Sequence, residues 1–544
     1  MSRQHIVESA GHADPWEGGI ARAVRQLRDS AAAAHERAHA LGRPVLAWTM
    51  ARIAPVDPLD LFEHTSGVAQ DRFFWERPDD GLALVGIGAA WRFTEEGDGR
   101  FARAETAWRS ILHKAVGDGV RGESFPGSRE EGTPGPGPIT LYGFAFAPEG
   151  PAAQPQAPPS AARHSGAARA TSMTPRWHGY PGSLLIIPRV LVSRIGGDSH
   201  ITLAFVIEPD GRSIVDLERF IGPDGAYHAI LARLTRRGAT GNEAGGTSRG
   251  PVGARYAARS TVADRVRTVE EFPPAGTWKA AVRETAGAVR DGLLHKAVLA
   301  RGLRIQGRDF DPAAALHALR AEYPGCTLFA VARGKRCFLG ATPERLVRLR
   351  NGEVTLAAVA GSAPRGRTEE EDRRLGERLL ASPKDGIEHA IVVDAVRQAL
   401  MDVSVDVAAE PSPRLLSMRN AHHLYTPIRA TLRDRPTVLA LADRLHPTPA
   451  VGGVPRAEAV VWIRRHEGWD RGWYAGPIGW MDHTGEGEAA VAIRSALVGA
   501  TEAFLFAGCG IVADSDPEQE YAESRLKLQP VLSALGGAMG ENAY

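Results

Sequence analysis

The dipeptide Asn351-Gly352 is the feature that most constrains how this chain can fold. It separates two runs of alternating apolar and polar residues in the stretch CFLGATPERLVRLRNGEVTL. Asn-Gly favours the two-residue turn that joins antiparallel strands, because both residues tolerate a positive φ angle. The sequence therefore predicts an antiparallel hairpin centred on this dipeptide.

Further helices and strands are predicted on both sides of this hairpin in the sequence. Helical periodicity predicts one helix in AAAAHERAHAL and another in TWKAAVRETAGAVRDGLL. GLALVGIGAAWRF is typical of a strand followed by a turn, and four later segments are each expected to form a strand: KAVLARGLRI, YAGPIGWMD, AAVAIRSALV and AFLFAGCGIV. Strands joined by hairpins between long helices predict an α+β fold with mainly antiparallel sheets.

Composition and charge exclude several classes of protein. The 544 residues are 43% hydrophobic and 24% charged, which is ordinary for a soluble globular protein. The net charge of +1 does not favour nucleic acid or an anionic membrane as a partner. No apolar run approaches the ~20 residues that span a bilayer, and the N-terminus lacks the apolar segment of a signal peptide. We therefore expect a cytoplasmic protein.

The three cysteines carry little information about function. Cys326, Cys337 and Cys509 are too few and too scattered for a disulfide framework or a zinc site. A reducing compartment agrees with this usage.

The chain divides into two portions of unequal regularity. Residues 1–270 are expected to be the N-terminal portion of one fold, and residues 271–544 its second portion, in which helix and strand patterns are denser. Stretches rich in Pro, Gly, Ala and Ser near 148–176 and 236–260 predict flexible surface insertions. Gly86 and Gly88 lack a third glycine at dinucleotide-motif spacing, so we expect them to serve close packing and not phosphate binding.

Charged residues collect near the start of the predicted helix in DSDPEQEYAESRLK. Ser515 or Asp516 can cap this helix, and Pro517 suits its first position. At 100° per residue, three side chains fall within roughly 60° of one another: Glu520, Glu523 and Lys527. The simpler interpretation is a solvated first turn, where acids suit the helix dipole. The alternative, a binding site, depends on what the fold brings to the same place.

A further carboxylate is expected on the buried side of a helix. In SPKDGIEHAIVVDAVRQAL, Ser382 can cap the helix and Pro383 follows it. Glu388 projects near the centre of an apolar stripe made of Ile387, Ile391, Val392, Ala395, Val396 and Ala399. A buried carboxylate must be ion-paired, hydrogen-bonded or bound to a cation, and a structural ion pair stays open as an interpretation. If Glu388 approaches Glu520 and Glu523, their charge requires a cation, and these hard oxygen donors suit Mg²⁺.

Lys296 and Glu344 occupy unusual positions for charged residues. On the strand HKAVLARGL, Lys296 shares a face with small and apolar residues, where burial would lower its pKa toward that of a usable base. The alternative is a side chain that extends to solvent. Glu344 follows Thr342-Pro343 at a bend, where a carboxylate is either held rigidly or exposed as a turn acid.

Nine motifs in this order resemble the chorismate-utilising enzymes, and specifically the isochorismate synthases. They are HKAVLARGL, FLGATPERLVRL, AVAGSAPRG, SPKDGIEHAIVV, HHLYTPI, LHPTPAVGGVP, RGWYAGPIGW, GEAAVAIRSA and FAGCGIVADSDPEQEYAESRLK. The resemblance is strong over about residues 275–535, and RFFWERPDDGLALVGIGAA is similar to the family's N-terminal portion. It implies two packed, mainly antiparallel sheets built from both halves of the chain, chorismate as the substrate, Mg²⁺ as the cofactor, and a monomer.

The resemblance also implies a role for individual residues. Lys296 stands where the family has the base that activates water for attack at C2 of chorismate, and Glu344 stands where it has the acid that protonates the departing C4 hydroxyl. Glu388 and Glu523 match the Mg²⁺-binding glutamates, with Glu520 beside the metal through water. The positions that match the substrate-binding pocket are Gly361, Ser362, Ala450, Tyr474, Arg494, Gly508 and Lys527.

Three positions distinguish the branches of the family. Relatives that make anthranilate usually have glutamine at the position of Lys296, and relatives that make aminodeoxychorismate have a nucleophilic lysine at Ala360. Ala450 stands where aminating and salicylate-forming relatives usually have threonine. These positions favour water addition with release of isochorismate. Ser362 keeps the hydroxyl of the commoner threonine, and Cys509 replaces a small alanine without a paired His that would make it a nucleophile.

Several alternatives remain open from the sequence. A salicylate synthase would continue by eliminating pyruvate from isochorismate, and a catalytically silent binding protein would retain the fold alone. The product could enter menaquinone, siderophore or another salicylate-derived synthesis. Of His422 and His423, which point apart on a regular element, one is expected to line the pocket or pack, without binding metal. The acidic run Glu369–Asp372 is expected to be an exposed helix start.

Overall fold

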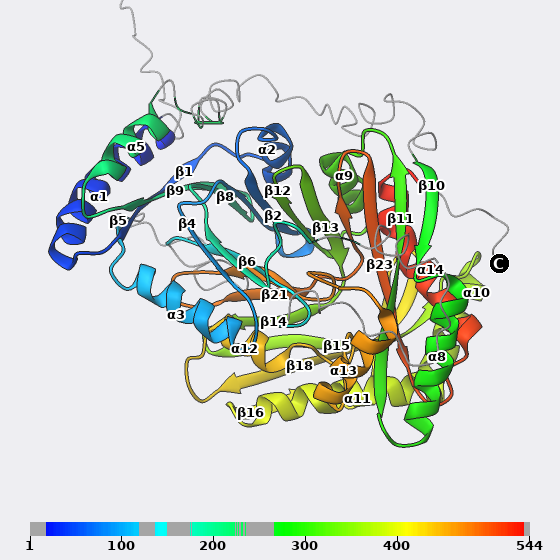
Figure 1. Ribbon diagram of the computed structural model, residues 1–544. Helices are drawn as coiled ribbons and strands as arrows, with labels where there is room; N and C mark the ends of the chain where they lie inside the picture. Colours follow the sequence, from blue (N-terminus) through cyan, green and yellow to red (C-terminus); the bar gives the residue numbers. More distant parts are fainter. Residues whose placement is uncertain are drawn as a thin grey trace, which may run out of the picture.

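A computed structural model describes residues 18–118, 137–148, 175, 177–222 and 266–537, together with positions 225, 227, 230, 231 and 234. The two insertions expected near 148–176 and 236–260 lie outside these residues, apart from positions 148 and 175. The described chain forms two large sheets whose apolar faces pack together (Figure 1). The predicted α+β architecture of two mainly antiparallel sheets is confirmed.

The first sheet has thirteen strands. Its order is β10-β11-β23-β22-β13-β12-β2-β3-β8-β9-β1-β5, with β19 paired to β11. Only β1 and β5 are parallel among its pairs. The strands are β1 (Val45–Ile53), β2 (Asp71–Arg77), β3 (Leu82–Ile87), β5 (Val116–Asp118), β8 (Val190–Ile195), β9 (Asp198–Ile207), β10 (Val266–Phe272), β11 (Lys296–Gly307), β12 (Thr327–Arg333), β13 (Arg336–Thr342), β19 (Gly453–Val454), β22 (Ser495–Val498) and β23 (Glu502–Ile511).

The second sheet has ten strands, all paired antiparallel. Its order is β16-β18-β15-β14-β21-β20-β6-β7-β4, with β17 paired to β18. The strands are β4 (Trp91–Glu95), β6 (Thr140–Phe144), β7 (Ser183–Ile187), β14 (Arg345–Arg350), β15 (Glu353–Pro364), β16 (Ser404–Ala409), β17 (Arg414–Ser417), β18 (Ala421–Leu432), β20 (Pro477–Met481) and β21 (Gly487–Val491). Both sheets therefore combine strands from the first and second halves of the chain.

The hairpin predicted at Asn351-Gly352 is confirmed. Arg350 at the end of β14 pairs with Glu353 at the start of β15. Asn351 and Gly352 have φ angles of 51° and 77°, as the two-residue turn requires.

The single strand predicted in AAVAIRSALV is wrong, because the chain changes sheets within it. Its first part belongs to β21 in the second sheet, and its last part is β22 in the first sheet. Arg494 lies at the crossing with a φ angle of 52°. The chain makes a similar crossing between β13 and β14, where Pro343 and Glu344 lie. Alternation of apolar residues does not reveal such a change, because both segments are buried strands.

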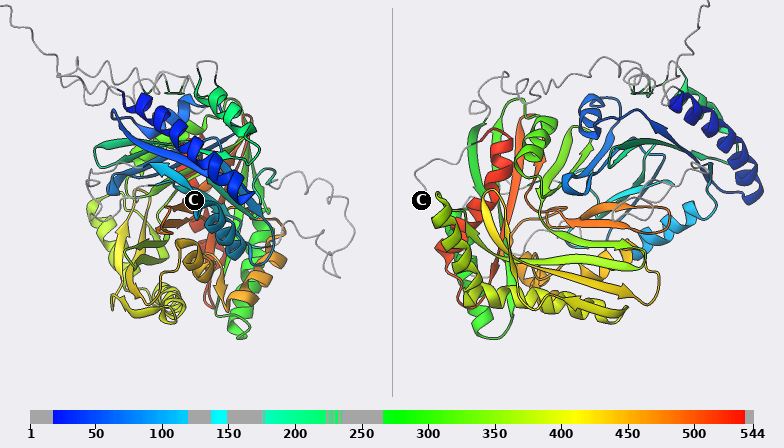
Figure 2. Two further views of the ribbon diagram at one scale, coloured as in Figure 1. Left: turned by 90° about the vertical axis from the view of Figure 1, so that its left-hand side faces the viewer. Right: turned by 180° about the vertical axis from the view of Figure 1, so that it is seen from behind.

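Helices cover the outer faces of both sheets, and α1 and α14 lie at opposite ends of the first sheet (Figures 1 and 2). The first sheet carries α1 (Gly19–Leu41), α2 (Pro58–His64), α5 (Arg212–Ile221), α9 (Pro312–Glu322) and α14 (Pro517–Ala534), and α8 (Ala275–Arg290) and α13 (Arg456–Glu467) lie beside β11. The second sheet carries α3 (Arg100–Leu112), α10 (Glu369–Leu380), α11 (Pro383–Met401) and α12 (Val438–Leu445), and a short 3-10 turn, η1 (Pro78–Asp80), precedes β3. No helix in the described part of the chain is long and apolar enough to cross a membrane.

The helix starts and the close packing at Gly86 were predicted correctly. Ser382 caps α11 and Asp516 caps α14, each with a proline directly after it. A Cβ atom on Gly86 would lie 2.5 Å from a Leu141 methyl group and 2.7 Å from Pro188 Cγ, so any larger residue would force one of these side chains to move.

The predicted apolar stripe of α11 needs one correction. Ile387 is 61% exposed, whereas the buried residues of this helix are Glu388, His389, Val392, Val396 and Leu400. The second sheet therefore covers a side of α11 that is rotated away from Ile387. Glu388 is buried as predicted.

Candidate active site

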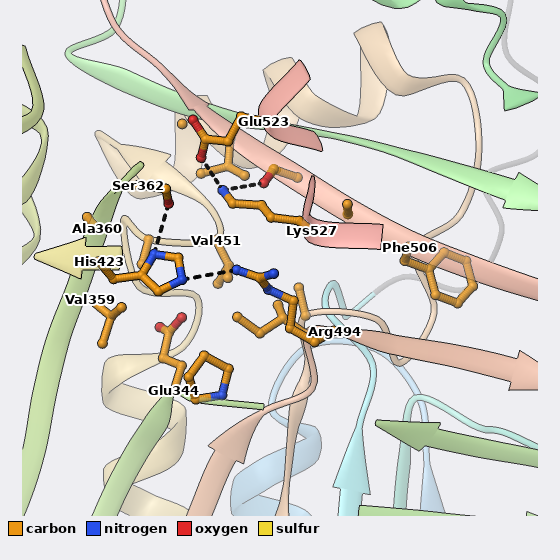
Figure 3. A pocket seen from close by; sticks show the side chains of 18 of the residues that line it. Glu344, Val359, Ala360, Ser362, His423, Val451, Arg494, Phe506, Glu523 and Lys527 are labelled. Carbon is orange, nitrogen blue, oxygen red and sulfur yellow. Dashed lines mark hydrogen bonds and ion pairs between the residues drawn. The ribbon is translucent and has the colours of Figure 1, made fainter. Parts of the chain in front are cut away.

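A cavity lies where the two sheets and α14 meet (Figure 3). The two chain crossings described above each contribute a charged side chain, Glu344 between β13 and β14 and Arg494 between β21 and β22. The side chains of Glu344, Arg494 and Lys527 point toward the same space (Figure 3). Glu344 and Arg494 lie between the strands of the two sheets and not within either strand, so their side chains can enter the space between the sheets.

The structure brings the predicted site residues to this one cavity. Those that line it are Glu344, Gly361, Ser362, Glu388, Ala450, Tyr474, Arg494, Gly508, Glu523 and Lys527. Lys296 and Glu520 do not line it but lie directly behind the lining, in contact with charged groups of the site. His423 also lines the cavity, as expected for one of the two adjacent histidines.

Lys296 begins β11 and is completely buried. Its Nζ atom lies 2.9 Å from Oε1 of Glu388 but makes no hydrogen bond of good geometry with any described group. The strand face predicted for Lys296 is correct, because Val298, two residues further along β11 and on the same face, lines the cavity. The interpretation in which Lys296 extends to solvent is therefore wrong.

Glu344 is also buried, with 6% of its surface exposed. Burial raises the pKa of its carboxyl to about 7, although the nearby charge of Lys296 acts in the opposite direction. Thr448 Oγ1 lies 3.5 Å from its Oε1, and the Glu344 carbonyl accepts a hydrogen bond from the Val491 amide. A buried carboxyl with a pKa near neutrality can hold a proton and deliver it to a substrate.

The acids of α14 are each paired with a lysine. Glu520 lies 2.7 Å from Lys384 Nζ and accepts a hydrogen bond from Ser515 Oγ, while Glu523 lies 2.5 Å from Lys527 Nζ. Burial and the charge of Glu523 raise the pKa of Glu520 to about 7. Burial acts in the same direction on Glu523, but Lys527 lowers its pKa overall. The interpretation of these acids as a solvated first turn is therefore wrong.

The carboxylates could hold a hard divalent cation. An oxygen of Glu520, an oxygen of Glu523 and Sγ of Cys509 all lie within 4.8 Å of one another. Glu388 faces the cavity from α11. Burial raises the pKa of a further acid, Asp385, and the charges of Glu388 and Glu523 raise it further. Carboxylate oxygens are the donors that Mg²⁺ prefers, so this group of acids fits the chemistry of a magnesium site.

Arg494 is buried, and only part of its hydrogen-bonding capacity is satisfied by described residues. Its Nη2 donates to Nε2 of His423 at 3.2 Å, whereas its Nη1 has no hydrogen-bond partner among the described residues. Burial lowers the pKa of His423 to about 3, so the ring is neutral and Nδ1 carries its proton next to Ser362 Oγ, 2.9 Å away. The neutral ring orients Arg494, and the N–H groups of its Nη1 stay available to an anion.

Three functional candidates in the site were missed from the sequence. Asp385 lies three residues before Glu388, a spacing that places both on one side of α11. Lys384 lies beside it and pairs with Glu520. Gly510 lies so close to Glu388 that a Cβ atom there would be 2.1 Å from Oε1. The i, i+3 pair of acids was visible in the sequence, but the need for glycine at 510 depends on α11, which is distant in the chain.

The adjacent histidines face different neighbours, and the acidic run Glu369–Asp372 is exposed in part. His422 points away from the cavity and contacts Asp372, 2.9 Å away, and Ser417. Glu369, Glu370 and Glu371 lie exposed in the first turn of α10, capped by Thr368, as predicted. Asp372 differs from the prediction, because it is only partly exposed and pairs with Arg365 and His422.

Comparison with known proteins identifies the family. Residues 32–536 match the protein family described as chorismate binding enzyme. The chain belongs to the chorismate-binding enzymes. The resemblance drawn from the nine motifs is thus confirmed.

Relatives of this chorismate-binding enzyme align along nearly its whole length. It is 36% identical over 525 residues to a salicylate biosynthesis isochorismate synthase of Pseudomonas aeruginosa, covering 95% of this chain and 96% of the relative. It is 30% identical over 525 residues to isochorismate synthase MenF of Bacillus subtilis, covering 94% and 98%. The solved menaquinone-specific isochorismate synthase MenF of Escherichia coli has the same fold, with a TM-score of 0.65 at 23% identity over 93% of this chain and 100% of that one.

Proposed function

We propose that this protein is an isochorismate synthase, which converts chorismate to isochorismate. The observation that carries the proposal is a buried lysine, Lys296, directly behind the lining of a cavity. Glu344, a buried carboxyl of raised pKa, and Arg494, which can bind an anion, both line this cavity. The two relatives that align along almost the entire chain, both named isochorismate synthases, support it.

The reaction exchanges one hydroxyl group for another. Lys296 takes a proton from water as the water oxygen bonds to C2 of chorismate. Both ring double bonds shift, and the C4–O bond breaks as Glu344 gives a proton to the departing hydroxyl, so that one water enters and one leaves. A positioned base and acid each contribute typically 10²–10⁴-fold to such a step.

The remaining polar groups would bind the two substrate carboxylates. Arg494, whose Nη1 has no partner in the described ranges, and Lys527 offer positive charge within the cavity. Glu388 and Glu523 would hold Mg²⁺, with Glu520 and Asp385 beside it. The bound cation would supply positive charge opposite a substrate carboxylate.

A salicylate synthase is the alternative that shares this chemistry. It would require a second step in the same cavity, in which isochorismate loses pyruvate. Ala450, which lines the cavity where salicylate-forming relatives usually have threonine, favours release of isochorismate. We also expect the enzyme to act as a monomer, as the resemblance to the family implies.

Product analysis tests the proposal. The purified protein is incubated with chorismate and Mg²⁺, the ring products are separated by chromatography, and pyruvate is measured with lactate dehydrogenase. We expect isochorismate without stoichiometric pyruvate. Salicylate with equal pyruvate would favour the alternative, and unchanged chorismate would identify a binding protein without activity.

A further inference from the structure

A buried ion pair beside the cavity has no place in the chemistry above. Glu467, the last residue of α13, and Arg471 have side chains that are 1% and 3% exposed. Arg471 Nε donates to Glu467 Oε2 at 2.8 Å, and its Nη2 donates to Oε1 at 2.5 Å. Arg471 borders the cavity.

This pair lies where β11 lacks a neighbouring strand. One edge of β11 pairs with β23 from Ala297 to Gln306, but its other edge pairs with β19 only as far as Ala297 and with β10 only from Gly302 onward. In the gap, the Val298 carbonyl accepts from Arg471 Nη2 at 2.8 Å, and the Ala300 amide donates to Glu467 Oε1 at 2.6 Å. The two side chains therefore satisfy backbone groups that a strand would otherwise satisfy.

Arg471 also contacts two other walls of the cavity, one through its guanidinium and one through its backbone carbonyl. Arg471 Nη1 donates to the Val451 carbonyl at 2.8 Å, and the Arg471 carbonyl accepts from the Tyr474 amide at 2.9 Å. Val298, Val451 and Tyr474 all line the cavity. One side chain thus connects the strand that begins at Lys296 with the loop that carries Ala450.

The two cavity arginines differ in how much of their hydrogen bonding the protein uses. Arg494 Nη1 has no partner among the described residues. Each side-chain nitrogen of Arg471, by contrast, donates to a carboxylate or a carbonyl of the protein. The hydrogen-bond donors of Arg471 are thus satisfied by protein groups, whereas Arg494 still has a donor nitrogen that can bind an anion.

The position of Glu467 is unfavourable for stability alone. It lies at the C-terminal end of α13, where the helix dipole disfavours a negative charge. Burial also raises its pKa, in opposition to the effect of Arg471. Apolar residues in their place would leave the Val298 carbonyl and the Ala300 amide without partners, so the pair serves the wall of the cavity where β11 lacks a neighbouring strand.

We propose that Glu467 and Arg471 are positioning residues that hold Lys296 and β11 in register with the loop carrying Ala450 and Val451. The inference rests on the proposed isochorismate synthase activity. Neither residue touches the substrate; both act through the strand and the loop. A shift of this wall by about 1 Å can cost on the order of 10²-fold in rate, because reacting groups need close alignment.

The test compares Arg471→Lys with two other conservative changes. Arg494→Lys removes a residue expected to bind the substrate. Arg320→Lys breaks a comparable network outside the cavity, in which Arg320 contacts both Asp57 and Glu76 at 2.6 Å. Steady-state kinetics with chorismate and Mg²⁺ are measured below each variant's melting temperature. We expect Arg471→Lys to lower kcat about 10- to 100-fold with little change in KM, Arg494→Lys to raise KM, and Arg320→Lys to lower the melting temperature alone.

Hydrogen exchange supplies a readout that does not depend on turnover. The amide of Ala300, which donates to Glu467, should exchange faster in Arg471→Lys than in the wild type and remain protected in Arg320→Lys. Glu467→Gln, whose amide oxygen can still accept from Ala300, should show a smaller loss of kcat. This variant tests the positioning role if Arg471→Lys does not fold.

The outcomes separate the two proposals. If the wild type and Arg320→Lys do not convert chorismate, the proposed function is wrong. If they do, and folded Arg471→Lys and Glu467→Gln keep wild-type kcat, the positioning role is wrong. A rise in KM for Arg471→Lys equal to that of Arg494→Lys, with unchanged kcat, would instead assign Arg471 to substrate binding and would also overturn the inference.

Discussion

Lys296 Nζ lies 2.9 Å from Oε1 of Glu388, so the residue we propose as the base is in direct contact with a residue we propose as a metal ligand. The lysine is completely buried, and 11% of the Glu388 side chain is exposed. The closeness of the two depends on Gly510 in β23, where any Cβ atom would lie 2.1 Å from the carboxylate and 2.7 Å from Lys296 Cε. The state of Glu388 therefore affects both the base and the metal site.

Glu388→Gln should destabilise the metal-free protein. The substitution leaves the buried Lys296 without its counter-ion, and breaking a buried pair costs about 3–5 kcal/mol. Urea denaturation in the presence of a chelator measures this loss. Glu370→Gln is the matched control, because Glu370 pairs with Arg373 and Arg374 on the exposed side of α10 and such pairs contribute little. Equal, small effects of both changes would contradict a buried pair at Lys296.

Gly510→Ala should abolish most of the activity. The added methyl group would overlap Glu388 and Lys296, so at least one of them must move out of place. A displacement of about 1 Å at a reacting group can cost on the order of 10²-fold in kcat. Gly276→Ala in α8, where no atom lies within 4 Å of the new Cβ, should leave kcat unchanged. Full activity of a folded Gly510→Ala variant would show that this contact is not needed.

The pH dependence of kcat should report Glu344. Its pKa is raised to about 7, so the carboxyl holds its proton below about pH 7 and loses it above. If it is the proton donor, kcat should fall about tenfold per pH unit on the alkaline side of that value. Glu344→Gln should lose at least about 10²-fold and should not show this alkaline limb. An unchanged alkaline limb in the variant would assign the titration to another group.

Lys296→Ala should stop hydration while chorismate still binds. The proposed role of the lysine is to act on water, whereas Arg494 and Lys527 would bind the substrate. We expect kcat to fall at least about 10²-fold, with a dissociation constant for chorismate close to that of the wild type by calorimetry. A variant that retains near-normal turnover would remove Lys296 from the mechanism.

Glu523→Gln should weaken the binding of Mg²⁺. Calorimetric titration with MgCl₂ in the absence of substrate measures the affinity directly, and the Mg²⁺ concentration for half-maximal turnover should rise in parallel. Glu518→Gln, on the same helix but with a side chain 72% exposed, is the control and should bind Mg²⁺ normally. Activity that survives complete chelation in the wild type would contradict a role for the metal.

The sequence by itself determined the local structure of this protein and the composition of its site. The Asn351-Gly352 turn, the capping residues Ser382 and Asp516, and the burial of Glu388 all follow from dihedral preferences and periodicity, which involve only neighbouring residues. The order of nine motifs was specific enough to indicate the family, because each motif carries several site residues.

Only the tertiary structure decided which of these residues meet. The splitting of AAVAIRSALV between two sheets, which places Arg494 in the cavity, depends on the order of strands and not on their alternation. The Lys296–Glu388 pair joins β11 of the first sheet to α11 on the second, and the Glu467–Arg471 pair fills a gap between β19 and β10. Periodicity states that a side chain is buried, but its neighbours are set by how distant elements pack, and this is also why Ile387 proved to be exposed.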